Sequence, residues 1–536
     1  MDILSNFKEK NFAVQIQLLN EIAEKKNYKA IGELFELFIN PLQDNCLDPM
    51  IEETLRELLQ NKEESTIKGL SSNNLRLKRL CIQVAGEKHF LSAVPFLVSC
   101  LEDKNNQELL FDLLLSLSKI KSPEFLEIFK RYVQDEDPII ATLSIEMIGF
   151  YRDASSLDLL YKIVKEAETE EQYKVCSIVT YKVIEALGNI ENKDALAFLV
   201  SNLHHRNPCA RRIIFEELFK KGAGVIPLIA PVFEQGDVDL KIMAANLLGL
   251  IGDRRGSDIL IDAIEKGKIS DPNGKYAVYE ALGAIPSIKG ITYLLEGLTI
   301  EDDLILMVII FSLNAHMNSD ISGGILTGLK ELIELNTPQS DKILQAVISS
   351  TALSLFEGLY KDKKTSKRLF RVLLRSGDKD VILEFCKKLD SIGEKETRVN
   401  LEKLLNKTTL SNEKKILVVD DSKTMLFFYR SAASTLGFYI TTATNGKEAL
   451  NFCEQRKAFD LIITDLNMPV MDGIEFVRSI RKDSFFRDIP IIMATTESEF
   501  FQKKIAVDAG VNYFLSKPFT MEELQKKIKE VIGMMK

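Results

Sequence analysis

The sequence holds few of the residues that build metal centres or disulfide frameworks. Its 536 residues include only four histidines and seven cysteines, and the cysteines are scattered without close pairs. An odd, dispersed set of cysteines is typical of reduced thiols in a core rather than of a secreted disulfide framework. We therefore expect a cytoplasmic protein without structural disulfides.

Long apolar segments are missing as well. The longest apolar run, LILMVIIFSLNA from Leu304 to Ala315, is well short of the roughly 20 residues that span a bilayer. The first ten residues carry charges of both signs, and no apolar segment of the signal-peptide type follows them. We expect a buried helix at 304–315, no signal peptide and no membrane insertion.

Basic residues are not in excess in any large part of the chain. The net charge is -9; residues 411–536 hold 18 basic and 17 acidic residues, and the residues before them hold 51 and 61. A nucleic-acid-binding surface needs a basic excess to neutralise phosphates. The sequence therefore predicts no nucleic acid partner.

From the start to about residue 405, apolar residues recur at the three- and four-residue spacing of helices. Three segments are visibly alike, and each predicts a helix, a glycine near a turn and a second helix: VIEALGNIENKDALAFLVSNL from Val183, AANLLGLIGDRRGSDILIDAI from Ala244, and VYEALGAIPSIKGITYLLEGL from Val278. Equivalents of that glycine lie 29 to 39 residues apart, at Gly86, Ser118, Gly149, Gly188, Lys220, Gly249 and Gly283. A period near 30 predicts an all-α solenoid of helix pairs, although the phasing fades before residue 70 and after about 300.

Helix-start signals agree with this phasing. Asp137-Pro138, Asn207-Pro208 and Asp271-Pro272 each place an N-cap residue before a proline at the first helical position. The EALG pieces and two-helix units resemble HEAT-type repeats, particularly the short HEAT-like kind of bilin lyases. The resemblance implies a scaffold that offers a long surface to partner proteins, and we refer to residues 1–405 as the array.

An iron-hydroxylase function of the array is not expected. Some HEAT-like proteins resemble iron hydroxylases that use His-Glu pairs, but none of the four histidines here is followed by glutamate (His89, His204, His205 and His316). With so few imidazoles, the sequence predicts no metal site in the array.

The spacing of apolar residues changes after a polar segment at 406–413, which we interpret as a linker. Residues 414–536 alternate strand-like apolar runs with amphipathic helical segments, the runs being ILVV, YITTAT, LIIT, IPIIMAT and YFLS. Five such alternations predict an α/β doubly wound domain with a five-stranded parallel sheet covered on both faces.

Polar residues follow the predicted strands at their carboxyl ends, where ligands bind in such sheets: Asp420, Asp421, Asp465, Thr495 and Lys517. The DDS stretch alone is also typical of a helix N-cap. Three converging carboxylates, however, repel one another without a cation, and hard oxygen ligands suit Mg²⁺. With the metal offsetting the charge of a phosphoryl group, one carboxylate can act as its nucleophile.

The pieces ILVVDDS, DLIITDLNMPVMDG, PIIMATTE and FLSKPF occur in order, and residues 414–536 resemble a flavodoxin-like response-regulator receiver domain of the chemotaxis-regulator type. The resemblance implies that Asp465 is the phosphorylated carboxylate. It implies Mg²⁺ ligation by Asp420, Asp421, Asp465 and the backbone carbonyl of Asn467. It also assigns a switch hydroxyl, an aromatic switch residue and an invariant lysine with a cis bond to Pro518, which are Thr495, Phe514 and Lys517.

Two further positions matter in the family. Asn467 and Glu497 stand where the resemblance places residues that tune dephosphorylation.

On the helix after ATTE, helical spacing predicts that Phe501 is buried with Ile505 and Ala509, while Phe500 projects as a contact of the switch surface.

The leading hypothesis is a two-component phosphorelay response regulator. A histidine kinase or phosphotransfer protein would phosphorylate Asp465, and the array would bind an unidentified protein as output or docking module. No helix-turn-helix and no GGEEF motif follows the receiver-like part, so we expect output by binding and no enzyme activity. The alternatives are a scaffold or phosphate sink that does not switch, and a receiver-controlled enzyme of the bilin-lyase type.

Overall fold

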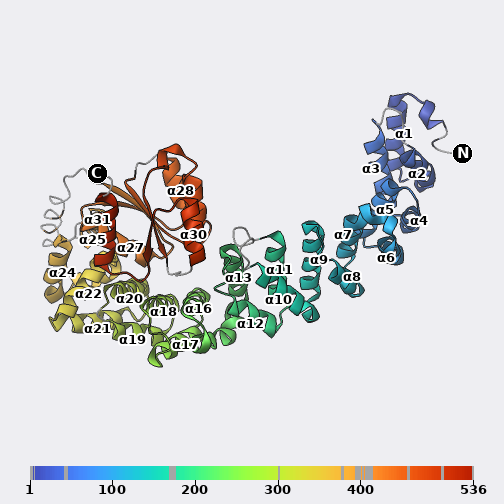
Figure 1. Cartoon of the computed structure of the whole chain (residues 1–536). Helices are drawn as coiled ribbons and strands as arrows, with labels where there is room; N and C mark the ends of the chain where they lie inside the picture. Colours follow the sequence, from blue (N-terminus) through green and yellow to red (C-terminus); the bar gives the residue numbers. More distant parts are fainter. Residues whose placement is uncertain are drawn as a thin grey trace. The chain divides into compact units, whose positions relative to one another are not determined.

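The computed structural model describes residues 4, 6–40, 46–167, 177–299, 302–375, 379–392, 400, 404, 414–455, 459–495 and 500–533. The chain divides into two compact units, residues 1–196 and 197–536. Helices fill the described chain up to Ile392, and all five described strands follow Lys414 (Figure 1). Among these residues, no helix combines the length and the apolar content that a membrane crossing requires.

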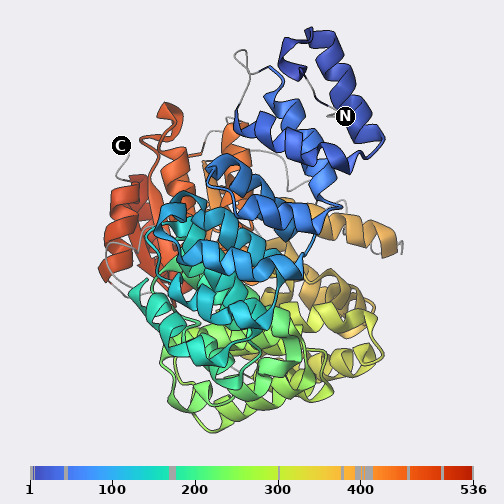
Figure 2. The same cartoon turned by 90° about the vertical axis from the view of Figure 1, so that its right-hand side faces the viewer.

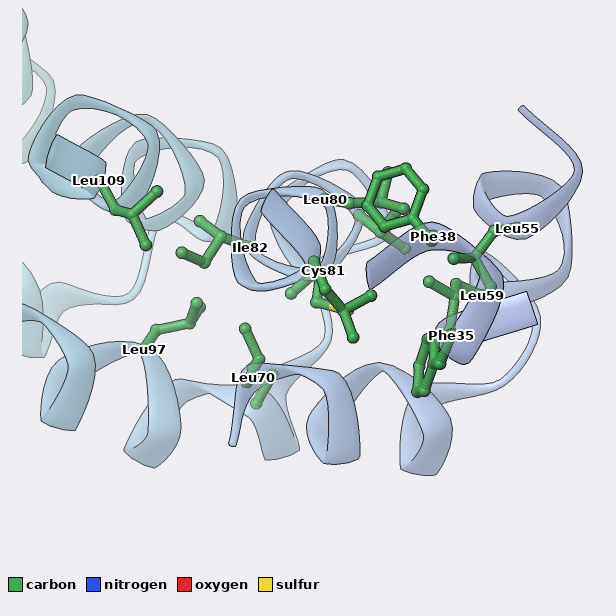
Figure 3. Packing of buried hydrophobic residues seen from close by; sticks show 14 of the residues in the cluster. Phe35, Phe38, Leu55, Leu59, Leu70, Leu80, Cys81, Ile82, Leu97 and Leu109 are labelled. Carbon is green, nitrogen blue, oxygen red and sulfur yellow. The ribbon is translucent and has the colours of Figure 1, made fainter. Parts of the chain in front are cut away.

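The first unit consists of short helices in antiparallel pairs. They are α1 (Phe12–Glu24), α2 (Ile31–Ile39), α3 (Asp48–Leu59), α4 (Glu63–Leu70), α5 (Leu75–Glu87), α6 (Val94–Glu102), α7 (Leu110–Ile120), α8 (Leu126–Arg131), α9 (Pro138–Tyr151), α10 (Leu157–Glu166), α11 (Ile178–Asn189) and the start of α12 (Lys193–Ser201). Figure 3 shows how α2 to α6 share one core, in which Phe35, Leu55, Cys81 and Leu97 are buried.

Helix pairs continue in the second unit. They are α13 (Pro208–Lys221), α14 (Ile226–Ile229), α15 (Val232–Gln235), α16 (Val238–Ile251), α17 (Arg254–Glu265), α18 (Pro272–Ala284), α19 (Ile288–Gly297), α20 (Asp303–Ala315), α21 (Ser322–Glu334), α22 (Pro338–Ser349), α23 (Leu353–Tyr360), α24 (Lys363–Arg375) and α25 (Lys379–Ile392). From α16 to α25, alternate helices pack on one another, so that α16, α18, α20, α22 and α24 form one layer and α17, α19, α21, α23 and α25 the other. Figure 2 shows these green and yellow helices from the side.

The predicted helix starts are confirmed. Asp137 and Asp271 accept hydrogen bonds from the first-turn amides of α9 and α18, and Asn207 does the same for α13. The helix pairs also persist beyond residue 300, where the sequence repeat fades. The fading therefore marks a change of side chains rather than the end of the architecture.

The marker glycines lie in the last turn of a helix, and close packing explains them. A Cβ atom on Gly249 would lie 2.9 Å from the Cα atom of Ala281 in the next repeat, and one on Gly149 would lie 2.9 Å from the Cα atom of Ala186. These distances are too short for any side chain. The glycine thus lets neighbouring helices of one layer approach each other.

Residues 414–533, which also belong to the second unit, form an α/β sheet domain. The strands β1 (Lys415–Val419), β2 (Tyr439–Ala443), β3 (Leu461–Asp465), β4 (Ile491–Thr495) and β5 (Tyr513–Ser516) make one parallel sheet in the order β2-β1-β3-β4-β5. Helices α27 (Lys423–Ser434) and α31 (Met521–Gly533) pack together on one face, and α28 (Gly446–Glu454), α29 (Gly473–Ile480) and α30 (Phe500–Ala509) cover the other (Figure 1). The predicted α/β doubly wound sheet is confirmed, as is the helical repeat array before it.

The structure tests the prediction about the cysteines but not the prediction about the linker. The linker predicted at 406–413 lies outside the described residues, and the domain boundaries at 405 and 414 stay predictions. The six described cysteines are not disulfide-bonded; four of them, Cys81, Cys100, Cys386 and Cys453, are buried, whereas Cys209 is half-buried and Cys46 is exposed, so the core location predicted for the cysteines is wrong for Cys46. The four buried cysteines agree with the reduced core thiols that the sequence predicts.

Candidate functional site

The acidic residues meet at the carboxyl edge of the sheet because β1 and β3 are neighbours. Val419 pairs with Thr464, so Asp420, directly after β1, lies beside Asp465, the last residue of β3. Asp420, Asp421 and Asp465 each offer a carboxylate oxygen, and these oxygens all lie within 4.8 Å of one another. Asp420 is 1 % exposed, whereas Asp421 reaches the surface.

Lys517 joins this cluster from the end of β5. Its Nζ atom lies 2.7 Å from Oδ2 of Asp420 and 3.1 Å from Oδ1 of Asp465. The lysine is fixed through its backbone, since its amide donates to the carbonyl of Thr495 over 3.0 Å. The peptide bond from Lys517 to Pro518 is cis, as the family resemblance implies.

The electrostatics follow from burying these charges together. Loss of hydration raises the pKa of Asp465 to about 6, against the lowering effect of Lys517. Loss of hydration, with Asp420 and Asp465 beside it, also raises the pKa of Asp421. Burial opposes the charge on Lys517, but the two carboxylates that it contacts raise its pKa well above the ordinary value. The pocket thus contains more negative charge than one lysine offsets.

Two local structures hold the acidic loops in place. Ser422 is the N-cap of α27, because its Oγ atom accepts from the amide of Met425, and its own amide donates to Asp420. Gly473 donates its amide to the carbonyl of Leu466, and a Cβ atom there would lie 2.0 Å from the carbonyl oxygen of Asp465. Only glycine therefore allows the loop after β3 to close against Asp465.

Of the remaining predicted site residues, Thr495 and Asn467 lie at the same edge, whereas Phe514 pairs with Met493 inside the sheet. Thr495 is buried at the end of β4, next to Ala494, which pairs with Asp465. Asn467 is half-buried two residues after β3, and Phe514 is half-buried within β5. The structure brings Asp420, Asp421, Asp465 and Lys517 into one cluster, with Thr495 on the neighbouring strand end.

Two predictions on the following segment fall outside what can be described. Glu497 lies outside the described residues. The side chains of Phe500 and Phe501 are also outside the part of the chain that the structure describes. Ile505 and Ala509 are buried, in agreement with the predicted inward stripe of α30.

Sequence reasoning missed three residues of α18 that reach the edge of this site. The Ser422 hydroxyl donates to Glu280 over 2.9 Å, the Tyr276 hydroxyl lies 2.6 Å from Ser422 Oγ, and Asn273 donates to the carbonyl of Lys517 over 2.8 Å. Glu280 belongs to the EALG piece that also occurs at Glu185, so the repeat pattern concealed it. No local signal in the sequence distinguishes it.

The donor set fits a small, hard divalent cation. In the part of the chain that the structure describes, Asp420, Asp421 and Asp465 are the group whose carboxylates converge closely enough to hold a metal ion. All three supply oxygen, the ligand that Mg²⁺ prefers, and an exposed Asp421 leaves room for water ligands. The carboxylates predicted to bind Mg²⁺ are therefore compatible with it.

Comparisons with known proteins agree with this geometry. Residues 416–529 match the family described as response regulator receiver domain. The chain is 42 % identical over 120 residues to chemotaxis protein CheY1 of Helicobacter pylori, a match covering 22 % of this chain and 97 % of that protein.

Two solved structures show similarity over the same part of the chain. One is the chemotaxis response regulator CheY4 of Vibrio cholerae, with 38 % identity, 22 % of this chain and 99 % of that chain covered, and a TM-score of 0.22. The other is the receiver domain of a sensor histidine kinase from Pseudomonas aeruginosa, described with a magnesium ion in its active-site cleft, with 31 % identity, 23 % and 98 % covered, and a TM-score of 0.22.

The family match and the curated relative define the class of this protein. The chain belongs to the response regulator receiver family, through the domain that contains Asp465. We call residues 414–536 the receiver.

Proposed function

We propose that this protein is a phosphorelay response regulator in which Asp465 accepts a phosphoryl group from a histidine kinase or phosphotransfer protein. The observation that supports this best is Lys517, whose ammonium group lies within ion-pair distance of both Asp420 and Asp465. A fixed cation beside a buried carboxylate prepares that carboxylate for reaction with an anionic donor.

The residues of the receiver divide the chemistry between them. A carboxylate oxygen of Asp465 forms a bond to phosphorus while the bond from phosphorus to the donor nitrogen breaks. Lys517 orients Asp465 and offsets the charge that accumulates on the phosphoryl oxygens. Thr495, buried at the next strand end, is the switch hydroxyl that would donate to the product, and Phe514 is the aromatic residue that would respond to it.

Asp420, Asp421, Asp465 and the backbone carbonyl of Asn467 are the groups that would hold Mg²⁺. The ion, when bound, supplies positive charge for the incoming phosphoryl oxygens. The family resemblance assigns Asp420 an indirect role through water, whereas Asp421 and Asp465 would be direct ligands.

The array is the protein-binding module in this proposal. Its repeats of paired helices resemble HEAT repeats. In such arrays each repeat packs on the repeats next to it, and the stacked helices present a long surface to a partner. We propose output through a bound protein rather than through an enzyme activity, in the cytoplasm. The unidentified partner remains to be found by capture with the phosphorylated and unphosphorylated chain.

The test is phosphorylation by acetyl phosphate with Mg²⁺, followed by intact-mass measurement. We expect the wild-type chain to gain one phosphoryl group, and Asp465→Asn to gain none. Asp483→Asn, a change of another receiver aspartate that caps a 3₁₀ turn, is the matched control and should be labelled like wild type. Labelling of Asp465→Asn at the wild-type level, or of wild type in excess chelator, contradicts the proposal.

A further inference from the structure

The receiver packs against the array within the second unit. Its helix α27 contacts α20 and α22, which are neighbours in one layer of the array. The rings of Phe427 in α27 and Phe311 in α20 lie 5.8 Å apart, and the hydroxyls of Ser431 and Ser349 lie 3.2 Å apart. In Figure 1 the receiver accordingly lies along the helices labelled α18, α20 and α22. We call these three helices the docking face.

Helix α18 meets the receiver at the edge of its acidic pocket. Ser422, which immediately follows Asp421, is held by both Tyr276 and Glu280. Asn273 holds the carbonyl of Lys517, on the other loop that forms the pocket. One helix of the array thus bonds to the two loops that carry the predicted metal ligands and the lysine.

This contact narrows the approach to Asp465 without sealing it. A protein donor must bring a phosphohistidine to the carboxyl edge of the sheet, where α18 already occupies part of the space. Asp421 is still exposed, so an ion or a small anion can enter. The docked arrangement therefore restricts large donors more than small ones.

The charges at the contact oppose phosphorylation. Glu280 is half-buried against the receiver, and its hydrogen bond from Ser422 places a further carboxyl group beside the acidic pocket. A phosphoryl group adds further negative charge to a pocket that already holds three carboxylates. Like charges repel more strongly where water is scarce, so the phosphorylated receiver fits this face less well.

We infer that the docking face of α18, α20 and α22 holds the chain's own receiver at rest, and that phosphorylation of Asp465 releases the receiver and uncovers this face. The trigger rests on the proposed function, whereas the docked contact does not. Because binding linkage is reciprocal, a substitution that separates the receiver from the array should also favour phosphorylation.

The experiment is amide hydrogen exchange on the full chain, with and without acetyl phosphate and Mg²⁺. In wild type, phosphorylation should increase exchange in both α20 and α27. Phe311→Asp should show the faster exchange before any donor is added, and its phosphorylated fraction at limiting donor should rise about fivefold or more. Asp465→Asn should stay protected with donor present.

Phe219→Asp is the matched control, because Phe219 is an exposed aromatic of α13 and lies outside the docking face. It should behave like wild type, and circular dichroism verifies that both variants keep their helices. Equal exchange in wild type and Phe311→Asp would show that the receiver does not dock, and protection that persists after complete labelling would show that phosphorylation does not release it. If the amides of α27 are protected from exchange but no variant becomes phosphorylated, the receiver docks and the proposed function is wrong. The release by phosphorylation would then be refuted as well.

Discussion

Lys517 is the residue on which the charge balance of the pocket depends. Asp420 is almost completely buried, and the ammonium group of Lys517 is the cation recorded beside it. A carboxylate in such a position needs compensation, since an unpaired buried charge is strongly destabilising. The paired aspartates after β1 are thus tolerated because a lysine from another strand reaches them.

Replacing this lysine should therefore weaken the receiver itself. We expect Lys517→Met to lower its free energy of unfolding by about 3 kcal/mol, because the charge of Asp420 loses its partner. Urea titration with hydrogen exchange read at β1 and β3 measures this, and Lys526→Met, at an exposed lysine, is the control. Added Mg²⁺ should restore part of the loss. Equal midpoints for the two variants would show that Lys517 is dispensable for stability.

Mg²⁺ binding should depend on pH through Asp465. Its pKa is raised to about 6, so the ion-free carboxyl gains a proton as the pH falls through 6, and a protonated carboxyl no longer binds the ion. We expect weaker Mg²⁺ affinity at pH 5 than at pH 8. Calorimetry suits this protein, which has no tryptophan to report binding. An affinity unchanged across this range would contradict the raised pKa.

How far the sequence predicts single residues depends on how local their signal is. Asp420, Asp465, Thr495 and Lys517 follow recognisable strands, and parallel pairing alone places strand ends at one edge. Glu280 could not be predicted, since its position in EALG looks like that of any repeat and its role depends on a contact with residues more than a hundred positions away.

At the scale of elements, the marker glycines show how one residue type sets a helix spacing. Four of them face a small residue of the next repeat: Gly86 faces Ser116, Gly149 faces Ala186, Gly249 faces Ala281, and Gly283 faces Ser312. In the first three pairs this small residue stands two positions before the next marker. The same offset after Ser312 leads to Asn314, where a glycine would continue the series. There the Asn314 side chain accepts from the amides of Ser354 and Leu355, at the start of α23.

Asn314 shows how a repeat can lose its marker glycine in sequence while the helix pairs continue. Asn314 contributes hydrogen bonds to a helix start, so a different side chain serves at the position of the marker. Period counting detects identical residues and not equivalent positions. The helices themselves remained predictable, because their apolar spacing and caps are local properties.

Replacing glycine by alanine should destabilise the array where the glycine packs against the next helix, and should not where the glycine faces open space. A Cβ atom on Gly283 would lie 2.2 Å from the Cβ atom of Ser312, so Gly283→Ala forces α18 and α20 apart. We expect a loss of about 1 to 3 kcal/mol in thermal or urea unfolding. Gly324→Ala is the control, since nothing lies within 4 Å of a Cβ atom there and the helix gains propensity. Equal stabilities of the two variants would refute the packing explanation.

At the scale of the whole molecule, charge predicts which partners are excluded. Residues before 411 carry 61 acidic and 51 basic side chains, and the receiver is close to neutral. We expect no binding of duplex DNA at physiological salt, because few phosphates could be neutralised. A fluorescence-anisotropy titration at two salt concentrations measures this. A tight complex that weakens steeply with added salt would contradict it.

The receiver should also fold without the array. The match to the Helicobacter pylori chemotaxis protein covers 97 % of that protein, so a domain of this kind suffices as a complete chain. Residues 411–536 contain the five described strands and the helices on both faces of the sheet. Among the described residues, separation from the array exposes one side of α27, including Phe427, together with the Ser422 hydroxyl and the Lys517 carbonyl that α18 contacts. We expect a fragment of residues 411–536 to unfold cooperatively in urea and to bind Mg²⁺, with Phe427→Ser improving its solubility and leaving Mg²⁺ affinity unchanged. An unfolded fragment would mean that the docking face is part of the receiver's fold, and the boundary predicted at 414 would then be wrong.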